Sequence, residues 1–364
     1  MQPFPVVDVA GSPFERGRQH GERARDRVAL SLKNYADLFA FCGMGWDEAQ
    51  RAALPYRDAI GALDGTLLEE MEGIAQGAGR PFGEILALNV RTEIMPASFM
   101  AGADMGECTA IAVGQGASAT GGTLLAQNWD WVGVQRAALV LLRFRNRDGL
   151  DCATLTEAGM LAKIGFNSAG FGVCLNILRS VFDGEKPGAP VHVLLRMLLE
   201  RTGVQDAVAF ASKLYFAGSS NVLCADRSGE SVALECSPIG LRTLNSRGGT
   251  LCHTNHFVDA EARKWQAELS PHLSTEDRLA CAERHAAARP KHGLEDVKRL
   301  LRDESAGLLS ICRKPDPSLP AQLRVETVAS VIMELDKNVM HIAPDVPSRC
   351  EYSTVDLKKA VEFA

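Results

Sequence analysis

The chain has 364 residues, of which 46% are hydrophobic and 23% are charged, so its composition is that of an ordinary globular protein and its length suits one large domain or two ordinary ones. The formal net charge of −6 at pH 7 gives no reason to expect nucleic-acid binding. No apolar run reaches the roughly 18 residues that would predict a membrane span.

The first hundred residues are predicted to be helical. Ser12 followed by Pro13 is typical of the start of a helix, and the stretch 15–41 is rich in Arg, Glu, Ala and Leu. Further helices are expected over residues 46–57 and 59–74 and in a segment that Pro81 opens.

The character of the sequence changes near residue 100. Residues 101–107 are small, polar and flexible, which favours an exposed loop or linker. Short strand-like runs follow, and Gly and Asn punctuate them as hairpins require. Strands are expected at 108–113, 123–131, 138–145, 162–167, 172–176, 221–226, 231–236, 251–255, 327–335 and 339–344, and helices over 191–215 and about 259–303. This alternation of helices and strands predicts an α+β fold in which helices cover the outer faces of sheets.

Ten cysteines are scattered along the chain, and no two stand in CxxC spacing. This pattern argues against a zinc or iron–sulfur site. Because the N-terminus lacks a basic start followed by a long apolar stretch, we find no secretory signal and expect a cytoplasmic protein whose cysteines are mostly reduced and buried. A catalytic cysteine must therefore be recognised by its surroundings.

Cys108 stands where the expected loop meets the first strand. Cleavage of the backbone before it would place a free α-amine, with a reference pKa of about 7.7–8.0, on the same residue as the thiol. Such an amine accepts a proton near neutral pH, and a thiol with a pKa of about 8.5 needs only modest help. From its position alone, however, a buried structural cysteine is the commoner alternative.

Several motifs in series resemble one family. They are GSPFERGRQHG at 11–21, NVRTE at 89–93, GECT at 106–109, QNWD at 127–130, TEAGMLAKIGFNSAG at 156–170, HTNH at 253–256 and SICR at 310–313. Their order and spacing resemble isopenicillin N acyltransferase and its relatives, the acyl-coenzyme A:6-aminopenicillanic acid acyltransferase group of self-cleaving N-terminal-nucleophile hydrolases.

The resemblance implies a four-layer αββα fold made as one precursor. A single N-terminal-nucleophile domain over residues 1–364 would cut itself between Glu107 and Cys108, leaving an α chain of 1–107 and a β chain of 108–364 that begins at the nucleophile. One departure concerns the cleavage site, because the fungal enzyme has Gly where this chain has Glu107. A bulkier, charged residue there could change the rate of self-cleavage without forbidding it.

Three further residues acquire expected roles from the resemblance. Asp130 would orient the amine of the nucleophile or a partner arginine, and adjacent hairpin strands would bring it back toward Cys108. Asn255 would donate a hydrogen bond to a developing oxyanion. Arg313 would pair with Asp130. The alternatives are a turn aspartate, a turn asparagine and a surface arginine that ends a strand.

His253 and His256 flank Asn255 and invite comparison with a Cys–His pair. A nucleophile that carries its own amine needs no histidine, so we expect both to serve in packing or hydrogen bonding. They also resemble a metal pair, but no cluster at ligand spacing supports a metal site. Residues 165–170 lack the Lys-Ser/Thr ending of a phosphate loop and are read as a hairpin turn.

The expected activity is that of a cysteine amide hydrolase or acyltransferase that acts on small N-acyl molecules through a thioester. No metal or organic cofactor is required. A coenzyme A thioester can serve as acyl donor, and a coenzyme A-dependent N-acyltransferase is therefore the main alternative. The expected partners are the small-molecule substrate and the two chains of one precursor, with no nucleic acid or membrane. A non-catalytic scaffold on the same fold and a conventional Cys–His thiol hydrolase stay open.

Overall fold

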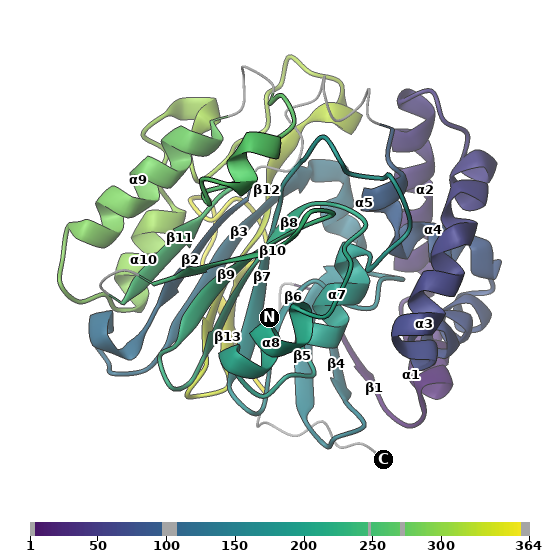
Figure 1. Ribbon diagram of the computed structural model, residues 1–364, viewed down its shortest axis with the longest axis horizontal. Helices are drawn as coiled ribbons and strands as arrows, with labels where there is room; N and C mark the ends of the chain where they lie inside the picture. The colour runs from purple at the N-terminus through teal and green to yellow at the C-terminus, as the bar shows by residue number, and fades with distance from the viewer. Residues whose placement is uncertain (1–3, 97–107, 247–248, 270–273, 358–364) are drawn as a thin grey trace.

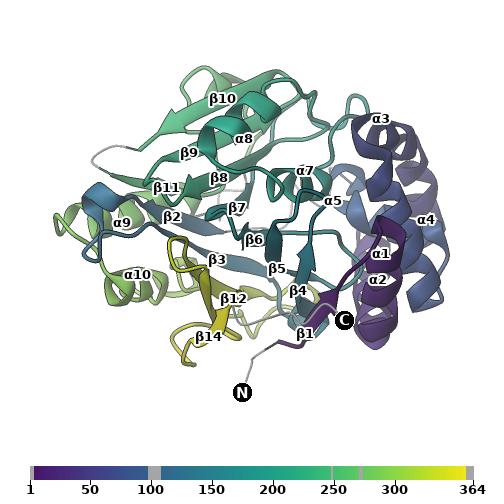
Figure 2. The ribbon, with the colours of Figure 1, turned by 90° about the horizontal axis from the view of Figure 1, so that it is seen from below.

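The computed structural model describes residues 4–96, 108–246, 249–269 and 274–357. Two stacked β-sheets lie between two layers of helices (Figure 1). Turned by 90°, the molecule shows the N-terminal helices at one end and the helices α9 and α10 at the other, with the strands between them (Figure 2). The predicted arrangement of helices on the outer faces of sheets is thus observed.

One sheet has eight strands and the other has six. The eight-stranded sheet has the order β1-β4-β5-β6-β7-β8-β9-β10, and all its neighbours are antiparallel except β1 and β4. Its strands are β1 (Val6–Val9), β4 (Leu139–Arg145), β5 (Asp151–Glu157), β6 (Ile164–Asn167), β7 (Phe171–Ile177), β8 (Ser220–Asp226), β9 (Ser231–Ser237) and β10 (Gly240–Asn245). The antiparallel six-stranded sheet has the order β11-β2-β3-β12-β13-β14. Its strands are β2 (Thr109–Val113), β3 (Leu124–Val132), β11 (Thr250–His253), β12 (Val325–Glu334), β13 (Val339–Ala343) and β14 (Ser353–Asp356).

The helices of the two layers come from different parts of the chain. The layer next to the eight-stranded sheet contains α1 (Pro13–Arg23), α2 (Arg25–Phe41), α3 (Trp46–Ala78), α4 (Phe82–Asn89), α5 (Arg91–Ile94), α7 (Val191–Leu198) and α8 (Val204–Ala211). The layer on the six-stranded sheet contains α9 (Thr275–Ala287) and α10 (Leu294–Leu301). Short 3₁₀ helices are η1 (Gln115–Ala117), η2 (Gly133–Ala138), η3 (Ala262–Trp265), η4 (Gly307–Leu309) and η5 (Ala321–Leu323). No helix of the described ranges combines the length and the apolar character needed to cross a membrane.

Most predicted elements are confirmed. The helices predicted to fill about 259–303 are, in the described residues, limited to η3, α9 and α10. Ser12 caps α1 through a reciprocal pair of hydrogen bonds with Glu15, so the predicted helix start is correct. The stretch 15–41 was predicted as continuous, but Ala24 separates α1 from α2. The two helices predicted over 46–74 belong to α3, whose kink lies at Asp64 with φ of −161° and ψ of 104°. Strands β1, β5, β10 and β14 were not predicted.

The packing of α1 on α3 depends on small residues. A Cβ atom on Gly17 would lie 1.9 Å from the backbone oxygen of Glu70, and one on Gly77 would lie 2.0 Å from that of Arg18. Because no side chain fits at such distances, the two helix backbones approach closely only with glycine at these positions. The GSPFERGRQHG motif is thus explained by packing, and its His20 accepts a hydrogen bond from the backbone of Gly159 at 3.1 Å.

The first strand after the undescribed segment lies inside the molecule. Strands β2 and β3 of one sheet pack against β7 and β8 of the other. All residues of β2 and β3 are buried. Because Cys108 immediately precedes β2, this stacking places it where the two sheets meet.

Candidate active site

Cys108 lies at the N-terminal end of β2 with 6% of its surface exposed. The β2–β3 register pairs Thr109 with Asn128, so the following residues of β3 return beside Cys108. The Cys108 Sγ atom is 3.9 Å from the backbone oxygen of Asp130. The expectation that hairpin strands bring these two residues together is confirmed. Glu107, the other residue of the expected cleavage site, lies outside the described residues.

The amide group of Asn255 faces the Cys108 backbone nitrogen. Cys108 N donates to Asn255 Oδ1 at 2.6 Å, and Asn255 Nδ2 donates to the carbonyl oxygen of Ile177 at 3.0 Å. The backbone nitrogen of Asn255 donates to Thr275 Oγ1 at 2.7 Å. These contacts determine which way the amide points, with its oxygen toward the Cys108 nitrogen. Donation by Nδ2 to an oxyanion stays a prediction.

The side chain of Asp130 is fully buried. Its Oδ1 atom accepts a hydrogen bond from Thr327 Oγ1 at 2.7 Å, while Oδ2 has no hydrogen-bond partner in the described part of the chain. Burial raises the pKa of Asp130 to about 7, and the Thr327 hydrogen bond and the charge of Arg278 oppose that rise. A carboxylate in this state can exchange a proton near neutral pH.

Arg278, in the first turns of α9, was not predicted to belong to the site. Its Nη1 donates to the Cys108 carbonyl oxygen at 2.8 Å and to Thr109 Oγ1 at 2.9 Å, and its Nη2 lies 3.2 Å from Asn255 Oδ1. Burial lowers the pKa of Arg278 to about 10, and the charges of Asp130 and Cys108 oppose this. Nothing in the local sequence distinguishes it from other helical arginines, because only the packing of α9 on β2 brings it inward.

Arg313 is connected to the site through its backbone. Its nitrogen donates to Thr327 Oγ1 at 3.0 Å, and the same hydroxyl donates to Asp130. Its carbonyl oxygen accepts from the Thr327 nitrogen at 3.0 Å. The SICR segment is thereby held beside β12, next to Asp130. The expected ion pair between the Arg313 side chain and Asp130 stays a prediction.

Two buried asparagines form a hydrogen-bonded chain that ends at the Cys108 backbone. Asn176 Nδ2 in β7 donates to the Cys108 carbonyl oxygen at 3.1 Å and approaches the His253 carbonyl oxygen at 3.4 Å. Asn221 Nδ2 in β8 donates to Asn176 Oδ1 at 2.9 Å. Sequence reasoning missed both, although a polar amide inside an otherwise apolar strand was an available signal.

Three of the sequence motifs meet in a buried charged cluster. Glu157 pairs with Arg91 at 3.2 Å and with Lys163 at 3.3 Å. The Lys163 ammonium lies 3.9 Å from the ring centroid of Trp129, and Arg91 stacks over Trp131 at 4.8 Å. The motifs at 89–93, 127–130 and 156–170 therefore meet through side-chain contacts that no local sequence pattern predicts.

Lys163 of this cluster acts on the Cys108 thiol electrostatically. Burial, with a smaller contribution from the charge of Asp130, raises the pKa of the thiol to about 11, although the Asp130 backbone hydrogen bond and the charge of Lys163 oppose this rise. Burial also lowers the pKa of Lys163 to about 8. The thiol is thus protonated at neutral pH, and a base would have to remove its proton before it could act as a nucleophile.

The two flanking histidines have other partners. His253 Nε2 lies 2.9 Å from Glu235 Oε1, and His256 Nδ1 lies 3.0 Å from Thr275 Oγ1. Both are buried. Within the described ranges, neither imidazole is hydrogen bonded to Cys108, so both occupy the packing and hydrogen-bonding positions expected for them.

Comparison with known proteins identifies the family. A model of the acyl-coenzyme A:6-aminopenicillanic acid acyl-transferase family matches residues 118–349. The 40 kDa form of acyl-coenzyme A:6-aminopenicillanic-acid-acyltransferase from Emericella nidulans is 30% identical over 316 residues, which cover 84% of each chain.

Two solved structures of conjugated bile acid hydrolase variants from Clostridium perfringens are 11% and 12% identical, with TM-scores of 0.50, and cover 70% of this chain and 93% of theirs. The fold is the expected αββα fold of N-terminal-nucleophile hydrolases. The family match decides against a non-catalytic scaffold. The chain is an enzyme and belongs to the acyl-coenzyme A:6-aminopenicillanic acid acyl-transferase family.

Proposed function

We propose that the protein is a self-processing cysteine amide hydrolase or acyltransferase that acts on small N-acyl molecules through a thioester acyl-enzyme. The observation that carries this proposal is the environment of the Cys108 nitrogen. This nitrogen lies 2.6 Å from Asn255 Oδ1, and the thiol of the same residue faces the backbone oxygen of Asp130. If the freed nitrogen is the base and the thiol of the same residue is the nucleophile, the nitrogen must be held in place beside the thiol.

Cleavage before Cys108 would be the activating event. In the uncut chain the nitrogen is an amide and cannot accept a proton, while burial raises the pKa of the thiol to about 11. After cleavage into residues 1–107 and 108–364, the nitrogen becomes an amine with a reference pKa of about 7.7–8.0. Its hydrogens can still donate to Asn255 Oδ1, and its lone pair can take the thiol proton.

The reaction then follows from the groups around Cys108. The thiolate attacks an amide or thioester carbonyl, and Asn255 Nδ2, with a backbone N–H, stabilises the oxyanion. The leaving group departs with a proton from the α-amine, and a thioester remains. Arg278 and Asn176 hold the Cys108 carbonyl so that the nitrogen and sulfur keep their positions. Water releases an acid, whereas an amine acceptor gives acyl transfer.

The choice between hydrolysis and transfer depends on the acceptor. The Emericella relative is named for acyl-coenzyme A and 6-aminopenicillanic acid. A coenzyme A-dependent N-acyltransferase is therefore the second candidate, with a coenzyme A thioester as acyl donor. Hydrolysis is placed first because it requires only water. Screening N-acyl amides, N-acyl amino acids and β-lactams with and without acyl-coenzyme A separates the two.

The decisive test concerns the freed amine. Wild-type protein should separate on a denaturing gel into pieces of about one third and two thirds of the chain, the larger beginning with Cys108, whereas Cys108→Ala should stay uncut. Residues 1–107 and 108–364 are then produced as separate chains and combined, with and without one extra residue before Cys108. The extended form should be nearly inactive, since an amide nitrogen accepts no proton.

Histidine variants provide the control for this test. His253→Ala and His256→Ala should cost far less activity than Cys108→Ser, provided that each variant folds. Full activity in the extended form, together with loss in either histidine variant, would establish a conventional Cys–His enzyme instead. Uncut wild-type protein with full activity would equally contradict the proposal.

A further inference from the structure

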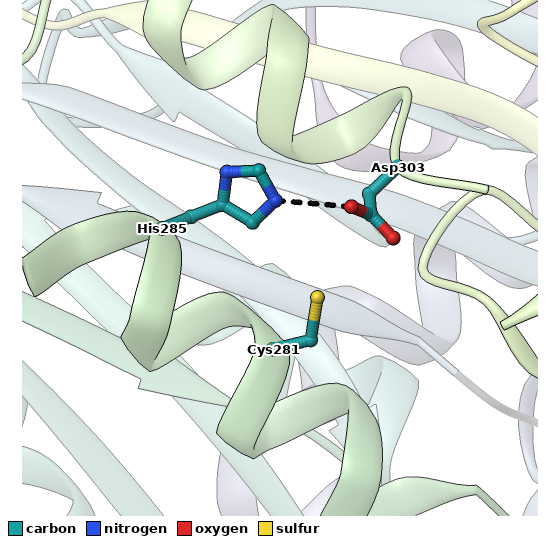
Figure 3. A group of neighbouring side chains, drawn as sticks. All are labelled: Cys281, His285 and Asp303. Atoms are coloured by element: carbon teal, nitrogen blue, oxygen red, sulfur yellow. Dashed lines mark hydrogen bonds and ion pairs between the residues drawn. The ribbon is translucent and has the colours of Figure 1, made fainter. Parts of the chain in front are cut away.

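A second group of reactive side chains lies away from Cys108, in the helical layer on the six-stranded sheet. Cys281 and His285 stand one turn apart in α9, and Asp303 follows α10. Their thiol, imidazole and carboxylate point toward one another (Figure 3). His285 Nε2 is 3.1 Å from Asp303 Oδ2, and the three ligand atoms all lie within 4.8 Å of one another. All three residues are half-buried.

This set of donors matches the preferences of zinc. Zn²⁺ binds Cys sulfur at about 2.3 Å and His nitrogen or Asp oxygen at about 2.0–2.2 Å in tetrahedral geometry. Tetrahedral donors at those bond lengths are about 3.3–3.7 Å apart, so movements of roughly 1 Å would complete the three-ligand site. Half-burial leaves a fourth position for water. In the rest of the described chain, no other three His, Cys, Asp or Glu side chains bring their ligand atoms this close.

The carboxylate is already oriented toward the other two ligands. Asp303 Oδ1 accepts hydrogen bonds from the nitrogen of Ser305 at 3.1 Å and from its hydroxyl at 2.7 Å. The Oδ2 atom is thereby directed toward His285. Hydrogen bonds of this kind to the non-ligating oxygen are typical of metal-binding carboxylates. A simple His–Asp ion pair would use two of the three residues, and the Cys281 thiol beside them adds the third donor.

We propose that Cys281, His285 and Asp303 bind one Zn²⁺ ion that ties α9 to the segment after α10. Both segments reach the active site. Arg278, which holds the Cys108 carbonyl, lies one helical turn before Cys281. The carbonyl oxygen of Asp303 accepts from the nitrogen of Cys312 at 2.9 Å, and Arg313 is the next residue. The ion would therefore stabilise the support of the site without touching the reacting atoms.

Neither the spacing of the cysteines nor the His253–His256 pair indicates this site. One cysteine and one histidine are four residues apart on a helix, and the third ligand is 18 residues further along the chain. Only the packing of the segment after α10 against α9 brings Asp303 to the other two.

Cobalt binding by the full-length protein tests the proposal. Protein freed of metal with a chelator is titrated with Co²⁺, which reports a thiolate ligand by a charge-transfer band in the near ultraviolet. We expect saturation at one Co²⁺ per chain and displacement by Zn²⁺. The band should disappear in Cys281→Ser and weaken at least tenfold in apparent affinity in His285→Ala. It should persist in Cys42→Ser, which removes another half-buried cysteine, and in Cys108→Ala.

Thermal unfolding gives a second readout. Zn²⁺ should raise the unfolding midpoint of wild-type protein and of Cys42→Ser but not that of Cys281→Ser, because an ion that binds only the folded state stabilises it. If His285→Ala does not fold, His285→Asn replaces it. A band that survives in Cys281→Ser, or the lack of any thiolate band in wild-type protein with excess Co²⁺, would overturn the proposal. Neither result bears on the cysteine mechanism, which the separate-chain experiment tests.

Discussion

Replacement of Asn255 by two different residues separates the role of its amide oxygen from that of its amide nitrogen. Its oxygen accepts from Cys108 N at 2.6 Å, and its nitrogen donates to the Ile177 carbonyl oxygen at 3.0 Å. Asn255→Ala removes both functions. Asn255→Asp keeps an acceptor for Cys108 N and for Arg278 but replaces the donor nitrogen with an oxygen. The two variants therefore differ in whether the α-nitrogen is held, while both lack a donor for the oxyanion.

If Asn255 donates to the oxyanion, both variants should lose kcat by roughly a hundredfold to a thousandfold, which corresponds to about 2.7–4 kcal/mol of transition-state stabilisation. KM should change less, because the donor matters most when charge develops. If Asn255 only positions the nitrogen, Asn255→Asp should stay within about tenfold of wild type. Asn255→Ala also loses three hydrogen bonds, each contributing about 1 kcal/mol, so about 3 kcal/mol of stability should go with it.

The assay is steady-state kinetics on the reconstituted chains 1–107 and 108–364, so that any effect on self-cleavage does not enter. Thermal unfolding of each variant verifies that it is folded at the assay temperature. Unchanged turnover in a folded Asn255→Asp enzyme would refute the oxyanion assignment and leave Asn255 as a positioning residue for the Cys108 nitrogen.

Two further changes test the surroundings of Cys108, and a third tests the packing of α1 on α3. Arg278→Met should destabilise the protein by about 3 kcal/mol in urea unfolding, because it removes a buried guanidinium that holds Cys108 and Asn255. It should also lower kcat more than it raises KM. Equal kinetics in Arg278→Met and wild type would contradict the positioning role of Arg278. Burial raises the pKa of Asp130 from 3.8 to about 7, so between these pH values the folded state keeps a proton that the unfolded chain releases. The free energy of unfolding should therefore fall by on the order of 4 kcal/mol as pH rises from about 4 to about 7. Asp130→Asn should flatten that decline in urea unfolding at several pH values, and an unchanged slope would exclude Asp130 as its source. Gly17→Ala should lower stability by about 2–3 kcal/mol because its Cβ would lie 1.9 Å from the Glu70 oxygen, whereas Gly65→Ala, with no atom within 4 Å, should be neutral or slightly stabilising in the same thermal scan.

The sequence was informative wherever a property depends on neighbouring residues. The cap at Ser12 and most strands of the two sheets follow from local patterns, because helix capping and strand alternation are short-range effects. The return of Asp130 to Cys108 also follows, since the two lie on consecutive strands of one hairpin. The series of motifs indicated the family and its fold, which the comparisons confirm.

The tertiary structure decided how these pieces meet. Arg278 looks like any helical arginine until α9 packs on β2. Asn176 is conspicuous as a polar residue in an apolar strand, but its partner is known only once the second sheet places it against the Cys108 carbonyl. Lys163 lies over the Trp129 ring and lowers the pKa of the Cys108 thiol by its charge, because the folded sheets place it there. Each of these contacts joins residues at least 34 positions apart in the chain. No local pattern encodes such pairs, because their distance is set by the packing of whole sheets and helices, whereas the cap, the strands and the hairpin are determined by residues that are already neighbours.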